Sequence, residues 1–255
     1  MPDETTEAPD HRFDSVDLTG ARFQDVDLTR ARFRNCDLTG AQIRGALLVD
    51  LELDGHLEGV TVNGVDVTAF VEAELDRRHP GRSAMRPSDA QGFREAWAIL
   101  ERLWPTTLER ARRLPPELLH ERVDDEWSFI ETQRHLLFVV DAWVKRAVLG
   151  DPSPYHPLDL AHDEMVHDPV VPYDPGARPT LDDLLPLRAE RTTVVRDLFA
   201  RLTDDVLAGT TAVTGPGYPE AGTYAVRRCL TAVVNEEWEH RLIAERDLAV
   251  LEAHR

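Results

Sequence analysis

The chain has 255 residues and a formal net charge of −18, and its hydrophobic content of 42% is enough for a real core. This charge argues against nucleic acid and anionic membrane surfaces, which attract Lys and Arg, and no segment has the apolar length that crosses a bilayer. The acidic N-terminus is unlike a signal peptide, and Cys36 and Cys229 cannot form a disulfide framework, so cytoplasmic localisation is expected.

An internal repeat occupies the first part of the chain. Large apolar residues recur every five positions: Phe13, Leu18, Phe23, Leu28, Phe33, Leu38, Ile43, Leu48 and Leu53. A period of five fits neither a helix nor a strand, so it indicates stacked units. If each unit is one side of a square coil, the large residue and the small residue two positions before it face the axis. Cys36, at a small inward position, is then predicted to be buried.

This pattern resembles the pentapeptide-repeat family, which forms a right-handed, four-sided β-helix. We expect such a domain over residues 11–67, with little more than two coils, and a solenoid this short needs capping by neighbours. Some long members imitate DNA. The outward positions here mix acidic and basic residues, such as Asp17 and Arg22, so a structural or dimerisation role is favoured over mimicry.

A linker is predicted over residues 68–86. Before it, Asn63-Gly64 indicates a hairpin turn between short extended pieces. Thr68 is expected to cap a short helix that ends at Arg78, because His79-Pro80-Gly81 follows.

Residues 87–255 are predicted to be helical. Ser88-Asp89-Ala90-Gln91 has the form of a capping box, Pro105 is expected to kink the first helix, and Thr180 caps the third. The expected helices cover residues 88–111, 128–149, 180–202 and 223–253. Residues 151–179 are read as a long ordered loop and 209–222 as a link. Four amphipathic segments predict a four-helix bundle.

A candidate metal site lies on two of these helices. Glu236 and His240 are four residues apart, so they share one helix face, which is otherwise apolar. His135 occupies a similar position on the second helix. Ionised groups in a bundle core are costly unless they are paired or bound to metal. The alternative is that His135 and His240 are ordinary core or surface histidines and that Glu236 is solvated. If the helix is irregular, Glu237 or Glu239 could be the ligand in place of Glu236.

The surrounding motifs resemble the DinB/YfiT-like superfamily of metal-binding four-helix bundles. The resemblance covers roughly residues 87–253, and its motifs are Glu126-Trp127-Ser128 before His135, and Glu-Trp-x-His at 237–240 followed by Arg246-Asp247-Leu248. It implies a metal held by His135, Glu236 and His240. Most members use three histidines. The glutamate resembles the mycothiol-dependent maleylpyruvate isomerase branch, which binds zinc through two histidines and one glutamate.

This resemblance implies a Zn²⁺-dependent S-transferase or isomerase that uses mycothiol or another low-molecular-weight thiol. Fe²⁺ or Ni²⁺ would accept the same ligands. The expected partners are a small-molecule electrophile and a second copy of the chain in a homodimer. Actinobacterial proteins join a pentapeptide-repeat segment to a DinB-type domain in the same way. A hydrolase that uses metal-bound water and a non-catalytic scaffold with a structural metal are the alternatives.

Further predictions concern other residues near these motifs, and no catalytic residue is assigned. Asp247 and Arg246 are candidates for cofactor binding. The alternative for Asp247 is a helix cap or a salt bridge, and the alternative for Arg246 is a solvated surface position. Three histidines of the long loop could supply a general base, although a surface role is the alternative: His156, His162 and His167. His162 or His167 could also be a fourth ligand of a structural metal. Cys229 is predicted to be a buried thiol, and Trp127 and Trp143 are predicted to lie in the core.

Overall fold

The computed structural model describes residues 12–162, 165 and 168–253, and the chain separates into two units between His56 and Leu57. His11, where the repeat was expected to begin, lies outside the described residues, as do Asp163 and His167 of the long loop. The described structure is rich in helix and has few strands. Among its helices, none combines the length and apolar character that crossing a bilayer requires.

The repeat unit turns a corner every five residues. Positive φ angles recur at that spacing, at Ser15, Gly20, Asp25, Arg30, Asn35, Gly40, Gly45, Asp50 and Gly55. Gly, Asn and Asp tolerate this left-handed region best. Between corners, the carboxylates of Asp17 and Asp27 accept backbone hydrogen bonds at 2.9 Å from the residue two positions on. The period of five is therefore a period of turns, and residues 12–59 contain no paired strands.

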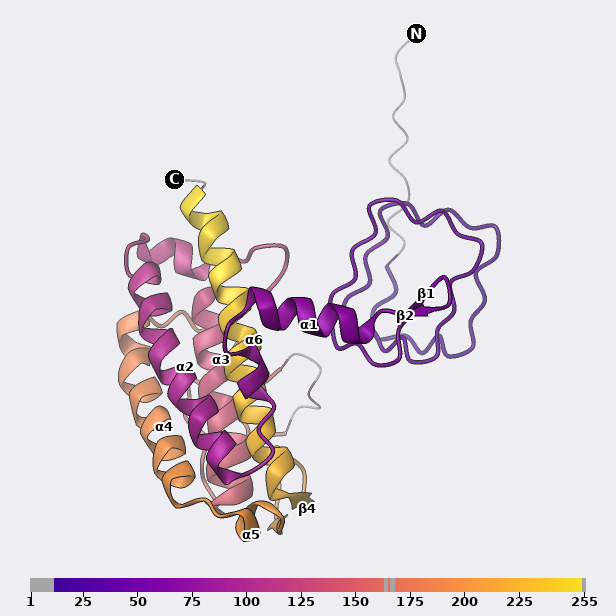
Figure 1. Cartoon of the computed structure of the whole chain (residues 1–255). Helices are drawn as coiled ribbons and strands as arrows, with labels where there is room; N and C mark the ends of the chain where they lie inside the picture. Colours follow the sequence, from indigo (N-terminus) through magenta and orange to yellow (C-terminus); the bar gives the residue numbers. More distant parts are fainter. Residues whose placement is uncertain (1–11, 163–164, 166–167, 254–255) are drawn as a thin grey trace. The chain divides into compact units, whose positions relative to one another are not determined.

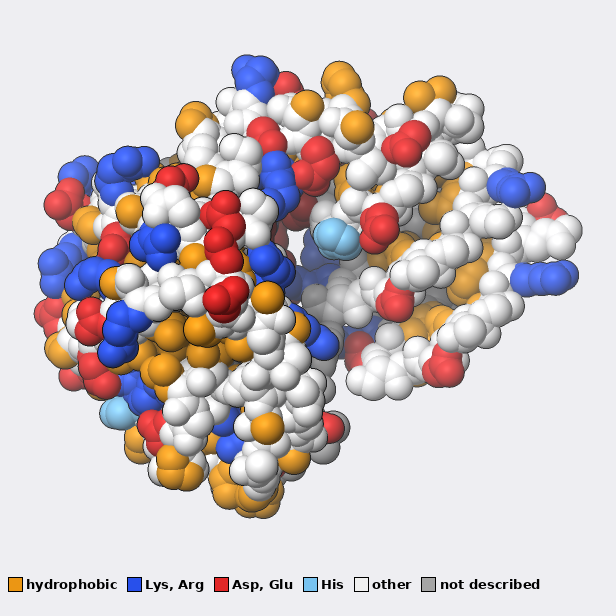
Figure 2. Space-filling view, turned by 60° about the horizontal axis from the view of Figure 1, so that its bottom comes forward, with side chains coloured by type: hydrophobic (Ala, Val, Ile, Leu, Met, Phe, Trp, Pro, Cys, Tyr) orange, Lys and Arg blue, Asp and Glu red, His pale blue; other side chains and the backbone are white. Residues whose placement is uncertain are grey.

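The large repeat residues are less covered than the sequence predicts. The nine side chains from Phe13 to Leu53 at the five-residue spacing remain 45% to 67% exposed. Cys36 is exposed as well, so the prediction that it is a buried core cysteine is wrong. A coil of little more than two turns leaves most side chains without a neighbouring coil to cover them. Figure 2 shows hydrophobic side chains between the turns of this unit and charged ones along its outer edge.

A short hairpin and a helix begin the second unit. β1 (Thr61–Val62) pairs antiparallel with β2 (Val65–Asp66), and the Asn63-Gly64 turn between them has positive φ at both residues. The helix α1 (Thr68–Arg78) follows, which confirms the predicted hairpin and helix. Thr68 is not its cap. The hydroxyl of Thr68 instead accepts a hydrogen bond from the backbone of Val60 at 3.1 Å.

Four helices form the core of the second unit. They are α2 (Ala90–Ala111), α3 (Phe129–Val140), α4 (Leu181–Arg201) and α6 (Val226–Ala253). Each of α2 and α3 packs against both α4 and α6 (Figure 1). Their shared core includes Phe93, Trp97, Leu136, Phe199 and Val233.

Short elements connect these helices. The 3₁₀ turn η1 (Arg82–Met85) precedes α2, and η2 (Pro116–His120) follows it. The short helix α5 (Asp204–Leu207) follows α4. Acidic and basic side chains are interspersed over the surface of this unit in Figure 2.

Three local features differ from the predicted helices. Asp89, one residue after the predicted cap, begins α2 by accepting from the Gly92 backbone at 2.7 Å, and the helix continues through Pro105. The second helix changes to a π-helical turn, η3 (Asp141–Val148), beyond Val140. The predicted link contains a hairpin of β3 (Thr210–Val213) and β4 (Gly222–Ala225). A run of β-branched residues favours β3, but it is short and was read as part of a link.

The long loop after η3 is held by a buried arginine. Arg134 on α3 donates hydrogen bonds to the carbonyls of Leu158 at 2.9 Å, Asp174 at 2.7 Å and Ala177 at 3.3 Å. Within the described part of the loop, Leu160 also forms a β-bridge with Tyr173. These contacts confirm order in the described part of the segment, and they place the carbonyl of Leu160 close to α3.

A buried carboxyl group completes the attachment of this loop. Asp141 at the start of η3 pairs with the Arg191 guanidinium through contacts of 3.1 Å and 2.8 Å. Asp159 of the loop lies beside Asp141, fully buried, with its Oδ1 lacking a hydrogen-bond partner among the described residues. Burial, and then the charge of Asp141, raise the pKa of Asp159 to about 8. Asp159 is therefore protonated at neutral pH.

Thiol reactivity tests the exposure of Cys36. Cys36 is exposed, whereas Cys229 is buried and burial raises the pKa of its thiol. We expect Ellman's reagent to titrate about one thiol per native chain and about two after denaturation. Cys36→Ser should remove the native signal. No reaction in the native protein would mean that the repeat buries Cys36 after all.

Stability as a function of pH tests the proton on Asp159. The pKa of Asp159 is raised from 3.8 to about 8, so the folded protein holds an extra proton between these values. Its contribution to the free energy of unfolding is therefore lost as the pH rises through this window. Asp159→Asn keeps its amide hydrogens at every pH, so its stability relative to wild type should rise by at least about 1 kcal/mol from pH ~5 to pH ~8.5.

Urea unfolding at several pH values measures this difference. Asp197→Asn, at an exposed position on α4, is the matched control and should follow the wild-type profile. Parallel profiles for wild type and Asp159→Asn would contradict the assignment.

Candidate metal centre

Three side chains from two helices converge in the second unit. His135 comes from α3, and Glu236 and His240 lie one turn apart on α6. The Glu236 Oε2 atom lies 3.3 Å from Nε2 of His135 and 3.1 Å from Nε2 of His240. One ligand atom from each residue lies within 4.8 Å of the other two. These are the three residues that the sequence places on facing helices, and their role as metal ligands stays a prediction.

The protonation of His135 follows from its second hydrogen bond. Its Nδ1 lies 3.0 Å from the carbonyl oxygen of Leu160, and a carbonyl only accepts hydrogen bonds, so the proton belongs on Nδ1. The ring is 5% exposed, and burial, aided by the neighbouring His240, lowers the pKa of His135. The neutral ring therefore presents the lone pair of Nε2 to Glu236.

Glu236 is ionised in this arrangement. Burial raises the pKa of its carboxyl group, but the hydrogen bond and charge of His240, 3.1 Å away, act in the opposite direction, and the pKa lies well below its ordinary value. Its side chain is still 39% exposed, so the centre is open to solvent on that side. A carboxylate oxygen thus faces an imidazole lone pair at 3.3 Å, and two acceptors at this distance repel each other unless a cation lies between them.

The donor set and spacing fit a divalent metal ion. Zinc binds imidazole nitrogen and carboxylate oxygen at about 2.0–2.2 Å, so neighbouring ligand atoms of a tetrahedral site lie about 3.3 Å apart. The two separations that involve Glu236, 3.1 Å and 3.3 Å, match this value, and all three ligand atoms lie within 4.8 Å of one another. The hydrogen bond from Nδ1 to Leu160 is the kind of outer contact that orients a metal-binding histidine.

Aromatic rings cover the two histidines. Trp127 stacks on His240 with ring centroids 5.8 Å apart and also lies 4.5 Å from the ring of His135. Phe138, one turn further along α3, lies 6.1 Å from His135. Trp127 was predicted to lie in the core. It is instead half-buried against these rings and forms a wall of the centre. Trp143 is also half-buried.

The residue before α3 explains how Trp127 is placed. Ser128 caps α3 by accepting from the backbone of Glu131 at 3.3 Å, and the Glu131 carboxylate accepts from the backbone of Ser128 at 2.8 Å. Glu131 also pairs with Arg122 at 2.6 Å. By spacing, Glu131 shares a face with His135, but its carboxylate is used by this cap.

The structure separates the alternative acidic ligands from the centre. Glu237 is buried and makes two 2.7 Å contacts with Arg188 on α4, and Glu239 is exposed. Asp247 is buried and pairs with Arg246 at 2.7 Å. Asp247 also lines a narrow pocket together with Trp127 and Thr132. Neither Arg246 nor Asp247 therefore joins the group of three ligand atoms, and their predicted role in cofactor binding stays a prediction.

The loop histidines occupy other positions. Nδ1 of His156 accepts a hydrogen bond from the Leu158 backbone at 3.1 Å. His162 packs edge-on against Tyr218 at 5.3 Å. Neither belongs to the convergent group formed by the described residues, and His167 lies outside them. Cys229 is fully buried, as predicted.

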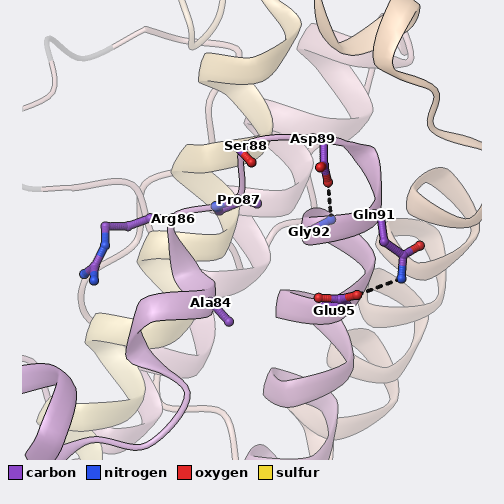
Figure 3. A pocket seen from close by; sticks show the side chains of 8 residues that line it. All are labelled: Ala84, Arg86, Pro87, Ser88, Asp89, Gln91, Gly92 and Glu95. Carbon is purple, nitrogen blue, oxygen red and sulfur yellow. Dashed lines mark hydrogen bonds between the residues drawn. The ribbon is translucent and has the colours of Figure 1, made fainter.

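A separate hollow of about 300 Å³ lies at the start of α2. Figure 3 shows its lining residues, among them Asp89, Gln91 and Glu95. Asp89 is occupied as the cap of α2, and Gln91 donates to Glu95 at 2.9 Å. The lining contains no histidine or cysteine, so it offers no second donor set of the kind formed by His135, Glu236 and His240.

Comparisons with known families agree with this architecture. Residues 12–48 match pentapeptide repeats in eight copies, and residues 99–244 match the DinB superfamily. Searches of curated proteins and of solved structures found no match. The DinB match covers more than half of the chain and includes all three convergent residues. The chain therefore belongs to the DinB superfamily and carries pentapeptide repeats before its DinB domain.

Proposed function

We propose that this protein is a metal-dependent enzyme that uses a low-molecular-weight thiol, with mycothiol as that thiol, for S-transfer to or isomerisation of a small electrophile. The observation that carries the proposal is the convergence of Nε2 of His135, Nε2 of His240 and a Glu236 oxygen. Each of the three atoms can offer a lone pair to a cation, and they meet beside an exposed edge. Three such atoms can bind a divalent cation and leave at least one of the cation's coordination positions open.

Zn²⁺ is the proposed metal, and Fe²⁺ or Ni²⁺ would accept the same donor set. In the described structure, three protein ligand atoms form the group, whereas structural zinc sites have four. A catalytic role is therefore favoured over the alternative of a scaffold with a structural metal.

Glu236 favours thiol chemistry over hydrolysis by metal-bound water. Two histidines and one glutamate form the ligand pattern that resembles the mycothiol-dependent maleylpyruvate isomerases, whereas most DinB-type proteins have three histidines. A metal in this position would supply a lowered pKa for a bound thiol or water molecule. Hydrolysis by metal-bound water is thus the second candidate.

The chain's own residues have distinct roles in this proposal. Leu160 holds the proton of His135 on Nδ1 and keeps Nε2 available. Trp127 and Phe138 form an apolar wall that limits water on one side. The exposed edge of Glu236 leaves access for a thiol and for an electrophile on the other side. The protein would work on small molecules in the cytoplasm, as a homodimer.

The same proposal includes the architecture of the two parts of the chain. We infer that the described repeat before the hairpin of β1 and β2 coils as a right-handed β-helix, supported by its five-residue turn period. We infer that residues 87–255 form a DinB-like four-helix bundle after a linker at 68–86, supported by the packing of α2 and α3 against α4 and α6.

Metal content tests the ligand assignment. Protein purified without a polyhistidine tag should contain about one divalent metal per chain, measured by elemental analysis. Glu236→Gln replaces an anionic ligand by a neutral amide, so metal affinity should fall by more than the roughly 100-fold that loss of an outer contact causes. Glu239→Gln, at an exposed position on the same helix, is the control and should bind metal normally. Equal metal contents in all three proteins would contradict the assignment.

Cobalt substitution tests the thiol. Cobalt-loaded protein should develop a sulfur-to-cobalt charge-transfer band when mycothiol or ethanethiol is added, because a thiolate would occupy the open position. The band should be absent from Glu236→Gln. A cobalt-loaded wild type that shows no band with excess thiol, yet hydrolyses an ester or amide without it, would replace thiol transfer by hydrolysis.

A further inference from the structure

The loop between β3 and β4 is fixed to the rest of the domain by a buried arginine. Arg146 of η3 donates hydrogen bonds to the carbonyls of Thr214 at 3.3 Å, Gly215 at 2.9 Å and Pro219 at 3.4 Å. The carboxylate of Asp168, from the long loop, accepts from the backbone of Gly217. Two segments that are distant in sequence thus hold this loop in one conformation.

Tyr218 is the residue that these contacts position. The hydroxyl of Tyr155 donates to the carbonyl of Tyr218 at 2.6 Å and accepts from its backbone nitrogen at 2.9 Å. Gly217 allows this approach. Its φ is +118°, and a Cβ atom there would lie 2.8 Å from the Tyr155 hydroxyl. The backbone of Tyr218 is therefore held on both sides, which limits where its ring can lie.

The ring of Tyr218 packs against Phe138, which forms part of the wall of the metal centre. It lies 5.7 Å from Phe138 and 5.3 Å from His162, and Phe138 in turn contacts His135. The side chain is half-buried. Burial, and then the negative charge of Glu236, raise the pKa of Tyr218, so its phenol remains a hydrogen-bond donor.

The hydroxyl of Tyr218 has no hydrogen-bond partner within the described structure, whereas Tyr155 and Tyr224 each donate to a carbonyl. Phenylalanine would fill the same aromatic wall, so packing alone does not account for the oxygen. The negative charge of Glu236 acts on this phenol, so the available donor lies within electrostatic reach of the metal centre.

We propose that the Tyr218 hydroxyl donates a hydrogen bond to an oxygen atom of the electrophile that is processed beside Glu236. This inference rests on the proposed function, because it requires a metal held by His135, Glu236 and His240. It also restricts the substrate class to electrophiles that carry a carbonyl or carboxylate oxygen. Tyr218 would then discriminate the electrophile, while the thiol is held by other contacts.

Two probes of cobalt-loaded protein separate these roles. Acetohydroxamate has oxygen atoms that can accept from a phenol, and ethanethiol has none. Tyr218→Phe should weaken acetohydroxamate binding about tenfold, as expected for loss of one hydrogen bond, and leave ethanethiol binding and cobalt affinity unchanged. Tyr173→Phe, at an exposed position in the long loop, is the matched control and should bind both probes as wild type does.

The outcomes distinguish this inference from the function on which it rests. Equal acetohydroxamate affinity in wild type and Tyr218→Phe would overturn the role of Tyr218 alone. Equal weakening of both probes would also overturn it, because the residue would then only support the shape of the centre. Failure of the wild type to bind cobalt would overturn the proposed function and this inference together.

Discussion

The hydrogen bond between Nδ1 of His135 and the carbonyl of Leu160 determines the chemistry of the whole centre. It places the imidazole proton away from Glu236, and burial keeps the ring from taking up a second proton. The lone pair of Nε2 must then face an ionised carboxylate at 3.3 Å. Two acceptors in contact, with a second imidazole at 3.1 Å, form a site whose unfavourable electrostatics a divalent cation would reverse.

Much of the surrounding structure serves to hold the carbonyl of Leu160 in place. Arg134, the neighbour of His135 in sequence, binds three carbonyls of the loop that carries Leu160. Asp159, next to Leu160, accepts from the backbone of His156 at 3.0 Å and lies buried beside Asp141, which pairs with Arg191. These buried polar contacts are costly unless fully satisfied, so they favour one conformation of the loop over others. Buried polar contacts of the loop therefore determine the orientation of His135, although the three candidate ligands themselves lie on helices.

Local sequence signals predicted the parts of the fold that depend on local chemistry. Thr180 caps α4 as expected, and the four-residue spacing put Glu236 and His240 on one face. Features that depend on distant contacts and carry no motif were not predicted. Tyr218 has no periodic pattern around it, and its position is set by Arg146 and Asp168, far away in sequence. The repeat pattern fixed the positions of the turns but not the burial of Cys36, because burial needs neighbouring coils.

The most direct test is a crystal structure with anomalous data collected at the zinc absorption edge. Our account predicts one metal ion, bound by Nε2 of His135, Nε2 of His240 and a Glu236 oxygen at about 2.0–2.2 Å, with a fourth position left to solvent or thiol. An anomalous peak elsewhere, a fourth protein ligand on the metal, or no peak in protein grown with excess zinc would contradict it.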